Sequence, residues 1–155
     1  MTTPDTADTT VRVTRHFEAA PARVFDAWLI REEWQAWIGP EGMHCDVPLL
    51  EPHVGGRYLI SMRLTADQRV PVGGIFKAID RPRTLVFTWG RADDPARASL
   101  LTLVFKPQGG ATELAFRQEG LPSVASRDDH TRGWNVAFDK LARHLAATPG
   151  AGAAV

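Results

Sequence analysis

Apolar residues alternate with polar ones through most of the chain, which is the pattern of strands that bury one face. The alternation begins at residues 11–18, where Val11, Val13 and Phe17 share one face. It returns in six later segments, which are separated by turn signals such as Gly-Gly and Arg-Pro. These segments cover residues 43–51, 56–64, 73–79, 84–89, 99–107 and 111–119. Their close spacing predicts an antiparallel meander rather than parallel strands joined by helices.

Helical spacing of apolar residues predicts helices at two places in the chain. Two short helices are expected between the first and second strands, one starting near Pro21 and one covering residues 31–38. A long helix is expected near the C-terminus, where Trp134, Phe138 and Leu141 share one face. The element order favours a sheet that curls around this long helix.

The sequence offers two starting points for the long helix. Ser126 and Asp129 have the spacing of a capping box, which predicts a start near Arg127. A start near Val124 is equally compatible with the residues.

The apolar face of the long helix turns polar in its first half. Upstream of Trp134 the same face reaches His130 and then Arg127. We expect these two side chains to face an opening between helix and sheet; the alternative is that the first turns of the helix project into solvent. Gly133 costs about 1 kcal/mol relative to alanine inside a helix, which predicts a close approach of the backbone to a strand or to the short helices.

The composition fits one soluble globular domain. Of the 155 residues, 44% are hydrophobic and 23% are charged, and 18 basic residues balance 18 acidic ones. There is no basic excess to bind nucleic acid, no apolar run of membrane-spanning length and no signal-peptide pattern. We therefore expect a cytoplasmic protein with a disordered tail over residues 1–10, a single domain over 11–146 and a flexible tail over 147–155.

Five segments together resemble the SRPBCC (START-like, helix-grip) superfamily, in the branch similar to the C-terminal domain of the heat-shock-protein-90 ATPase activator. The segments are FEAAPARVFDAWLIREEWQAWIGP, VGGRY, GGIFKAIDRPRTLVFTW, TLVFKPQGGATELAFRQEGL and HTRGWNVAFDKLARHL. They follow the family's order and spacing over nearly all of residues 11–145. The resemblance implies an α+β helix-grip fold, in which a curved seven-stranded antiparallel sheet wraps around the C-terminal helix and leaves a hydrophobic cavity.

Members of the wider superfamily bind lipids, sterols, polyketides or plant hormones, and some are cyclases or aromatase-like enzymes. The resemblance therefore implies a protein that binds a small hydrophobic or amphipathic molecule without a reaction. A cyclase, dehydratase or hydrolase in the same cavity would need an acid or base, for which His130 is the strong candidate and Glu119 or Asp46 the helpers. A co-chaperone-like interaction module is the third alternative, and an exposed patch at Trp34 and Trp37 would favour it.

Aromatic and polar residues on the inner faces of the predicted elements are the candidate ligand-binding residues, since ligand pockets are apolar with a few polar groups. They are Trp37, Tyr58, Met62, Phe76, Trp89, Phe116, Gln118, His130 and Trp134. We expect no metal site at His44, Cys45 and His53, because adjacent strand residues point to opposite faces. No cofactor is expected, and the sequence leaves a homodimer open.

Overall fold

The computed structural model describes residues 8–147, so that residues 1–7 and 148–155 of the two predicted tails lie outside the described part. A seven-stranded antiparallel sheet forms the frame, in the order β1-β7-β6-β5-β4-β3-β2. Its strands are β1 (Val11–Phe17), β2 (Asp46–Leu50), β3 (Arg57–Arg63), β4 (Arg69–Asp80), β5 (Thr84–Arg91), β6 (Ser99–Gln108) and β7 (Ala111–Glu119). The predicted α+β helix-grip fold is therefore confirmed.

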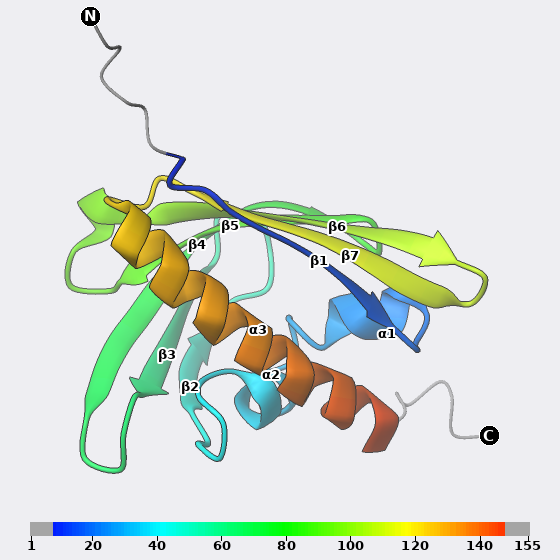
Figure 1. The fold of residues 1–155 in the computed structure, drawn as a ribbon, viewed down its shortest axis with the longest axis horizontal. Helices are drawn as coiled ribbons and strands as arrows, with labels where there is room; N and C mark the ends of the chain where they lie inside the picture. Colours follow the sequence, from blue (N-terminus) through cyan, green and yellow to red (C-terminus); the bar gives the residue numbers. More distant parts are fainter. Residues whose placement is uncertain (1–7, 148–155) are drawn as a thin grey trace, which may run out of the picture.

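Helices cover the concave side of the sheet. They are α1 (Pro21–Asp26), α2 (Arg31–Trp37) and α3 (Val124–Ala147), and a short 3-10 turn, η1 (Pro95–Arg97), joins β5 to β6. The long α3 runs diagonally across the curved sheet, and α1 and α2 lie towards its C-terminal half (Figure 1). Within residues 8–147, no helix is long and apolar enough to cross a bilayer.

Two strands, β2 and β4, differ most in length from the sequence prediction. β4 begins at Arg69 rather than residue 73, because it continues its ladder with β3 as far as the Arg63–Arg69 pair. β2 is shorter than predicted and begins at Asp46. Its register with β3 shifts between Asp46 and Leu49, around Pro48, whose backbone nitrogen carries no hydrogen to donate.

Aromatic rings fill the space between the sheet and α1, α2 and the second half of α3. Trp28 lies at the centre of this cluster, with its ring centroid 4.6 Å from that of Trp37 and 6.2 Å from that of Phe138. Phe87 joins Trp28 to the sheet at a centroid distance of 6.1 Å. The space between the sheet and the second half of α3 is consequently filled by core side chains.

The long helix begins at Val124, so the capping-box prediction at Ser126 is wrong. The hydroxyl of Ser123 accepts a hydrogen bond from the Ser126 N–H at 3.1 Å, which makes Ser123 the N-cap. The Ser126 hydroxyl lies 3.4 Å from Nδ1 of His130, one turn further into the helix. Ser123 and Ser126 both lie where a helix N-cap could be, and Ser123 is the one that caps α3.

Candidate functional site

A cleft with a volume of about 520 Å³ lies between the first half of α3 and the β3–β5 part of the sheet. Its lining combines apolar side chains with a few charged groups. The lining residues are Ile38, Gly39, Pro40, Glu41, Met62, Leu64, Val70, Val72, Trp89, Asp129, His130, Arg132, Gly133, Trp134, Val136 and Ala137. An apolar concavity of this size matches the usual dimensions of small-molecule sites.

Neighbouring strands supply the sheet wall of the cleft. Met62 pairs with Val70 across β3 and β4, and Val72 lies two residues further on the same face. Trp89 extends this wall from β5, and its side chain is almost completely buried. The alternation that buries the core face of these strands also gives the cleft its apolar wall.

One face of α3 forms the opposite wall. His130, Gly133, Trp134 and Ala137 follow each other at helical spacing and all line the cleft. A Cβ atom at residue 133 would meet no heavy atom within 4 Å. The predicted close approach of the backbone at Gly133 is therefore wrong, and the missing side chain instead leaves open space in the cleft.

The segment after α2 forms a third wall, and a buried lysine holds it in place. Nζ of Lys140, on α3, donates to the carbonyl oxygens of Ile38, Gly39, Pro40 and Met43 at 3.3, 3.3, 3.0 and 2.9 Å. Burial lowers the pKa of this ammonium below its usual value. Because its donors are directed at backbone carbonyls, Lys140 acts on the cleft by positioning this wall.

A chain of hydrogen bonds fixes the indole of Trp134 and reaches the backbone of Trp89. Nε1 of Trp134 donates to Oε1 of Gln118 at 2.9 Å, and Nε2 of Gln118 donates to Oγ of Ser99 at 2.8 Å. Ser99 in turn donates to the carbonyl oxygen of Trp89 at 2.7 Å. Gln118 is fully buried, so its amide supports the tryptophan wall from behind rather than facing the cleft.

The structure brings four of the nine predicted ligand-binding residues to the cleft and places five in the core behind it. Met62, Trp89, His130 and Trp134 line the cleft. The buried residues are Trp37, Tyr58, Phe76, Phe116 and Gln118. Their role in binding a ligand stays a prediction, and their contacts are described next.

Trp37 and Tyr58 have internal hydrogen-bond partners. Nε1 of Trp37 donates to the carbonyl oxygen of Ala27 at 3.1 Å. The hydroxyl of Tyr58 donates to the carbonyl oxygen of Thr88 at 2.6 Å, and burial raises the pKa of this phenol well above its ordinary value. Tyr58 is thus a neutral structural donor.

The two predicted phenylalanines pack against aromatic neighbours. The ring of Phe76 lies 5.6 Å from that of Tyr58, and the ring of Phe116 lies 4.7 Å from that of Trp134. Phe116 therefore supports a cleft residue from behind, as Gln118 does.

Much of the lining was not predicted from the sequence, including Gly133, Ala137 and residues 38–41. A signal for part of it was present, because Gly133 and Ala137 lie on the same helical face as His130. No local pattern marks residues 38–41, since their position depends on Lys140, about 100 residues later.

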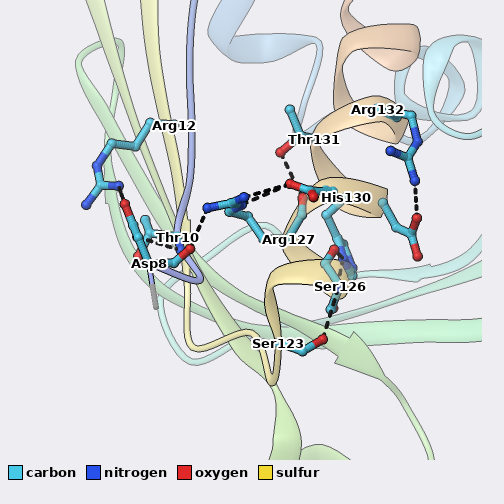
Figure 2. Close-up of polar contacts among 11 residues, drawn as sticks. Asp8, Thr10, Arg12, Ser123, Ser126, Arg127, His130, Thr131 and Arg132 are labelled. Atoms are coloured by element: carbon cyan, nitrogen blue, oxygen red, sulfur yellow. Dashed lines mark hydrogen bonds and ion pairs between the residues drawn. The ribbon is translucent and has the colours of Figure 1, made fainter. Parts of the chain in front are cut away.

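The first turns of α3 point His130 and Arg127 in different directions (Figure 2). Nδ1 of His130 lies 2.8 Å from the carbonyl oxygen of Ser126, and the residue lines the cleft. Arg127 was expected to face the same opening, but it does not line the cleft. Its guanidinium instead donates to the carbonyl oxygen of Asp8 at 2.6 Å and pairs with Asp128, which fastens α3 to the segment that precedes β1.

The charged groups of the cleft are paired with one another or with their neighbours. Asp129 pairs with Arg132 on the helix surface, and Glu41 pairs with Arg143 at 2.6 Å. Within residues 8–147, no carboxylate is hydrogen-bonded to His130 and no group of three or more His, Cys, Asp or Glu residues could hold a metal ion.

The features expected of a protein-interaction module can also be located. Trp34 and Trp37 are both completely buried, so they form no exposed aromatic patch. Their rings belong to the core: Trp34 lies 5.1 Å from Tyr58, and Trp37 packs on Trp28.

Comparison with known proteins identifies the family. A family model described as activator of Hsp90 ATPase homolog 1-like protein matches residues 18–146. Among solved structures, a protein from Chromobacterium violaceum is 27% identical with a TM-score of 0.80, over 87% of this chain and 95% of that one. The AHSA1 protein from Silicibacter pomeroyi is 28% identical with a TM-score of 0.74, over 89% of this chain and 98% of that one. None of the curated proteins matches this chain. The chain therefore belongs to the activator of Hsp90 ATPase homolog 1-like (AHSA1) family, a branch of the SRPBCC superfamily.

Proposed function

We propose that this protein binds a small hydrophobic or amphipathic molecule in the cleft between the sheet and the first half of α3. The observation that carries the proposal is the apolar cleft of about 520 Å³, whose walls are held open by rigid neighbours. The Gln118–Ser99 hydrogen bonds fix the indole of Trp134 and the backbone of Trp89, and Lys140 fixes residues 38–41. A preorganised wall lowers the entropy cost of binding. The SRPBCC fold, which commonly takes hydrophobic ligands, supports the same conclusion.

Titration with the neutral fluorophore N-phenyl-1-naphthylamine tests this proposal, because its emission rises in apolar surroundings. Val70→Glu places a carboxylate in the cleft, and we expect it to weaken probe binding at least tenfold. Val104→Glu is the matched control, since Val104 is an equally half-buried strand valine on the opposite face of the sheet. If both variants fold and bind the probe as the wild type does, the cleft is not the binding site.

Native mass spectrometry of the purified protein complements the titration. We expect a co-purified or added apolar molecule to be retained at one per chain. The same spectra report whether two chains associate into the homodimer that the sequence leaves open.

A further inference from the structure

The polar groups of the cleft carry information about the polar end of its ligand. We infer that the molecule bound there is uncharged, and that it donates one hydrogen bond to Nε2 of His130 while its apolar body lies against Gly133 and Trp134. This inference rests on the proposed function and specifies its ligand class.

The hydrogen bond to Ser126 determines which ring nitrogen of His130 is available. The Ser126 carbonyl oxygen can only accept, and Nδ1 of His130 lies 2.8 Å from it, so Nδ1 carries the hydrogen. In a neutral imidazole the other nitrogen is then an acceptor. Nε2 has no hydrogen-bond partner within residues 8–147 and is not sealed in the core, so a molecule in the cleft can reach it.

The other polar groups that approach the cleft either have a partner or can only donate. The indole nitrogen of Trp89 belongs to the second kind, since it is a donor with no hydrogen-bond partner within residues 8–147. The indole nitrogen of Trp134 donates to Gln118, and Lys140 donates to backbone carbonyls. Asp129 and Arg132 form an ion pair with each other. His130 is consequently the described cleft residue with an unused, uncharged nitrogen acceptor and a fixed orientation.

The charges of the lining disfavour an anion. Two carboxylates, Glu41 and Asp129, line the cleft against one guanidinium, Arg132. Each of these charges is already paired, since Asp129 binds Arg132 and Glu41 binds Arg143. An added carboxylate would therefore lose hydration in the apolar cleft without gaining an uncommitted cation among the described lining residues. A fatty acid anion is therefore a poor fit, whereas an alcohol or a phenol suits both the apolar lining and the acceptor.

The position of His130 orients such a ligand. Gly133 and Trp134 lie three and four residues after His130, so they are next to it on the helix face. The bare backbone at Gly133 leaves room for a flat apolar group, and the fixed indole of Trp134 offers it a surface. Polar and apolar ends of the ligand thereby meet complementary groups on one helix.

Three naphthalene probes that differ in their polar end test the inference: 2-naphthylmethanol, its methyl ether and 2-naphthylacetate. At pH 8 we expect the alcohol to bind wild-type protein about fivefold more tightly than the ether, which is the contribution of one hydrogen bond, and the carboxylate to bind most weakly. His130→Phe should bind alcohol and ether equally, whereas His130→Gln, which keeps an acceptor oxygen, should restore part of the difference. His53→Phe, in an exposed turn, is the matched control and should behave as the wild type does.

The possible results separate the inference from the proposed function. Equal affinity of wild-type protein for alcohol and ether, a preference that persists in His130→Phe, or tightest binding of the carboxylate would overturn the inference and leave hydrophobic binding intact. Failure of all three probes to bind would contradict the proposed function itself.

Discussion

Replacing Gly133 by alanine tests the shape of the cleft with the smallest possible change. Alanine is favoured over glycine by about 1 kcal/mol inside a helix. A Cβ atom at this position meets no heavy atom within 4 Å, so no clash offsets the gain. We expect Gly133→Ala to raise the free energy of unfolding by about 1 kcal/mol, and Tm by roughly 3–4 °C for a domain of this size.

A larger side chain at the same position separates stability from binding. Gly133→Leu places an isobutyl group in the cleft of about 520 Å³, beside Trp134. We expect this variant to fold and to bind N-phenyl-1-naphthylamine at least tenfold more weakly than the wild type, a loss of about 1.4 kcal/mol. Ala146→Leu adds a leucine at an exposed site near the end of α3 and should leave probe binding unchanged.

Urea and thermal unfolding, followed by circular dichroism, measure the stability of each variant, and fluorescence titration measures its probe affinity. A Gly133→Ala variant less stable than the wild type would show that a neighbour occupies the space at this position. A folded Gly133→Leu variant with wild-type probe affinity would refute the argument that this space belongs to the binding site.

Three further predictions concern individual hydrogen bonds of the structure. Gln118→Leu should lower the free energy of unfolding by about 1–3 kcal/mol in urea titrations, because a buried indole N–H loses its acceptor. Lys140→Met should cost about 3 kcal/mol and weaken probe binding, because buried carbonyl oxygens lose a charged donor; Arg143→Met, which removes only an exposed ion pair, should cost about 1 kcal/mol or less. Hydrogen bonding to Gln108 raises the pKa of His16, so an NMR titration should give a midpoint above about 6.5, and the stability that His16 contributes is complete below that pH and is lost as pH rises through the raised pKa.

Each of these predictions has a contrary result. If the free energy of unfolding of Gln118→Leu lies within about 0.5 kcal/mol of the wild-type value, the Trp134 indole must find another acceptor. If Lys140→Met and Arg143→Met lower the free energy of unfolding equally, the positioning role of Lys140 is contradicted. A His16 midpoint at or below about 6.5 would contradict the contribution of its hydrogen bond to Gln108.

Local periodicity was sufficient to predict the helices and strands, and the family resemblance then implied how they pack. Alternation along each strand and the turn residues between strands are local properties, so all seven strands and their order along the chain could be read from the sequence. The extra length of β4 could not, because it depends on pairing with β3 across the turn at residues 64–68. Likewise, Ser123 and Ser126 both suit a helix start, and the fold decides between them.

The candidate site was only partly predictable, because a core residue and a cleft residue have the same pattern in the sequence. Phe76 and Trp89 both face inwards from their strands, yet Phe76 is enclosed by other rings whereas Trp89 lines the cleft. A glycine inside a helix was recognised as unusual in the sequence, but the open space beside Gly133 could be seen only in the structure. Lys140 gives no signal at all, since a lysine on a helix usually faces solvent and the carbonyls that it binds converge only in the folded chain.

The central claim is that an apolar molecule binds against the wall made by β3, β4 and α3, and methionine NMR tests it most directly. The chain has three methionines, of which Met62 lines the cleft and Met43 lies outside its lining. Protein labelled with ¹³C at the methionine methyl groups is titrated with 2-naphthylmethanol. The account predicts a saturable shift of the Met62 methyl resonance with little change at Met43. An unmoved Met62 resonance at probe concentrations that saturate binding, or a larger shift at Met43, would contradict it.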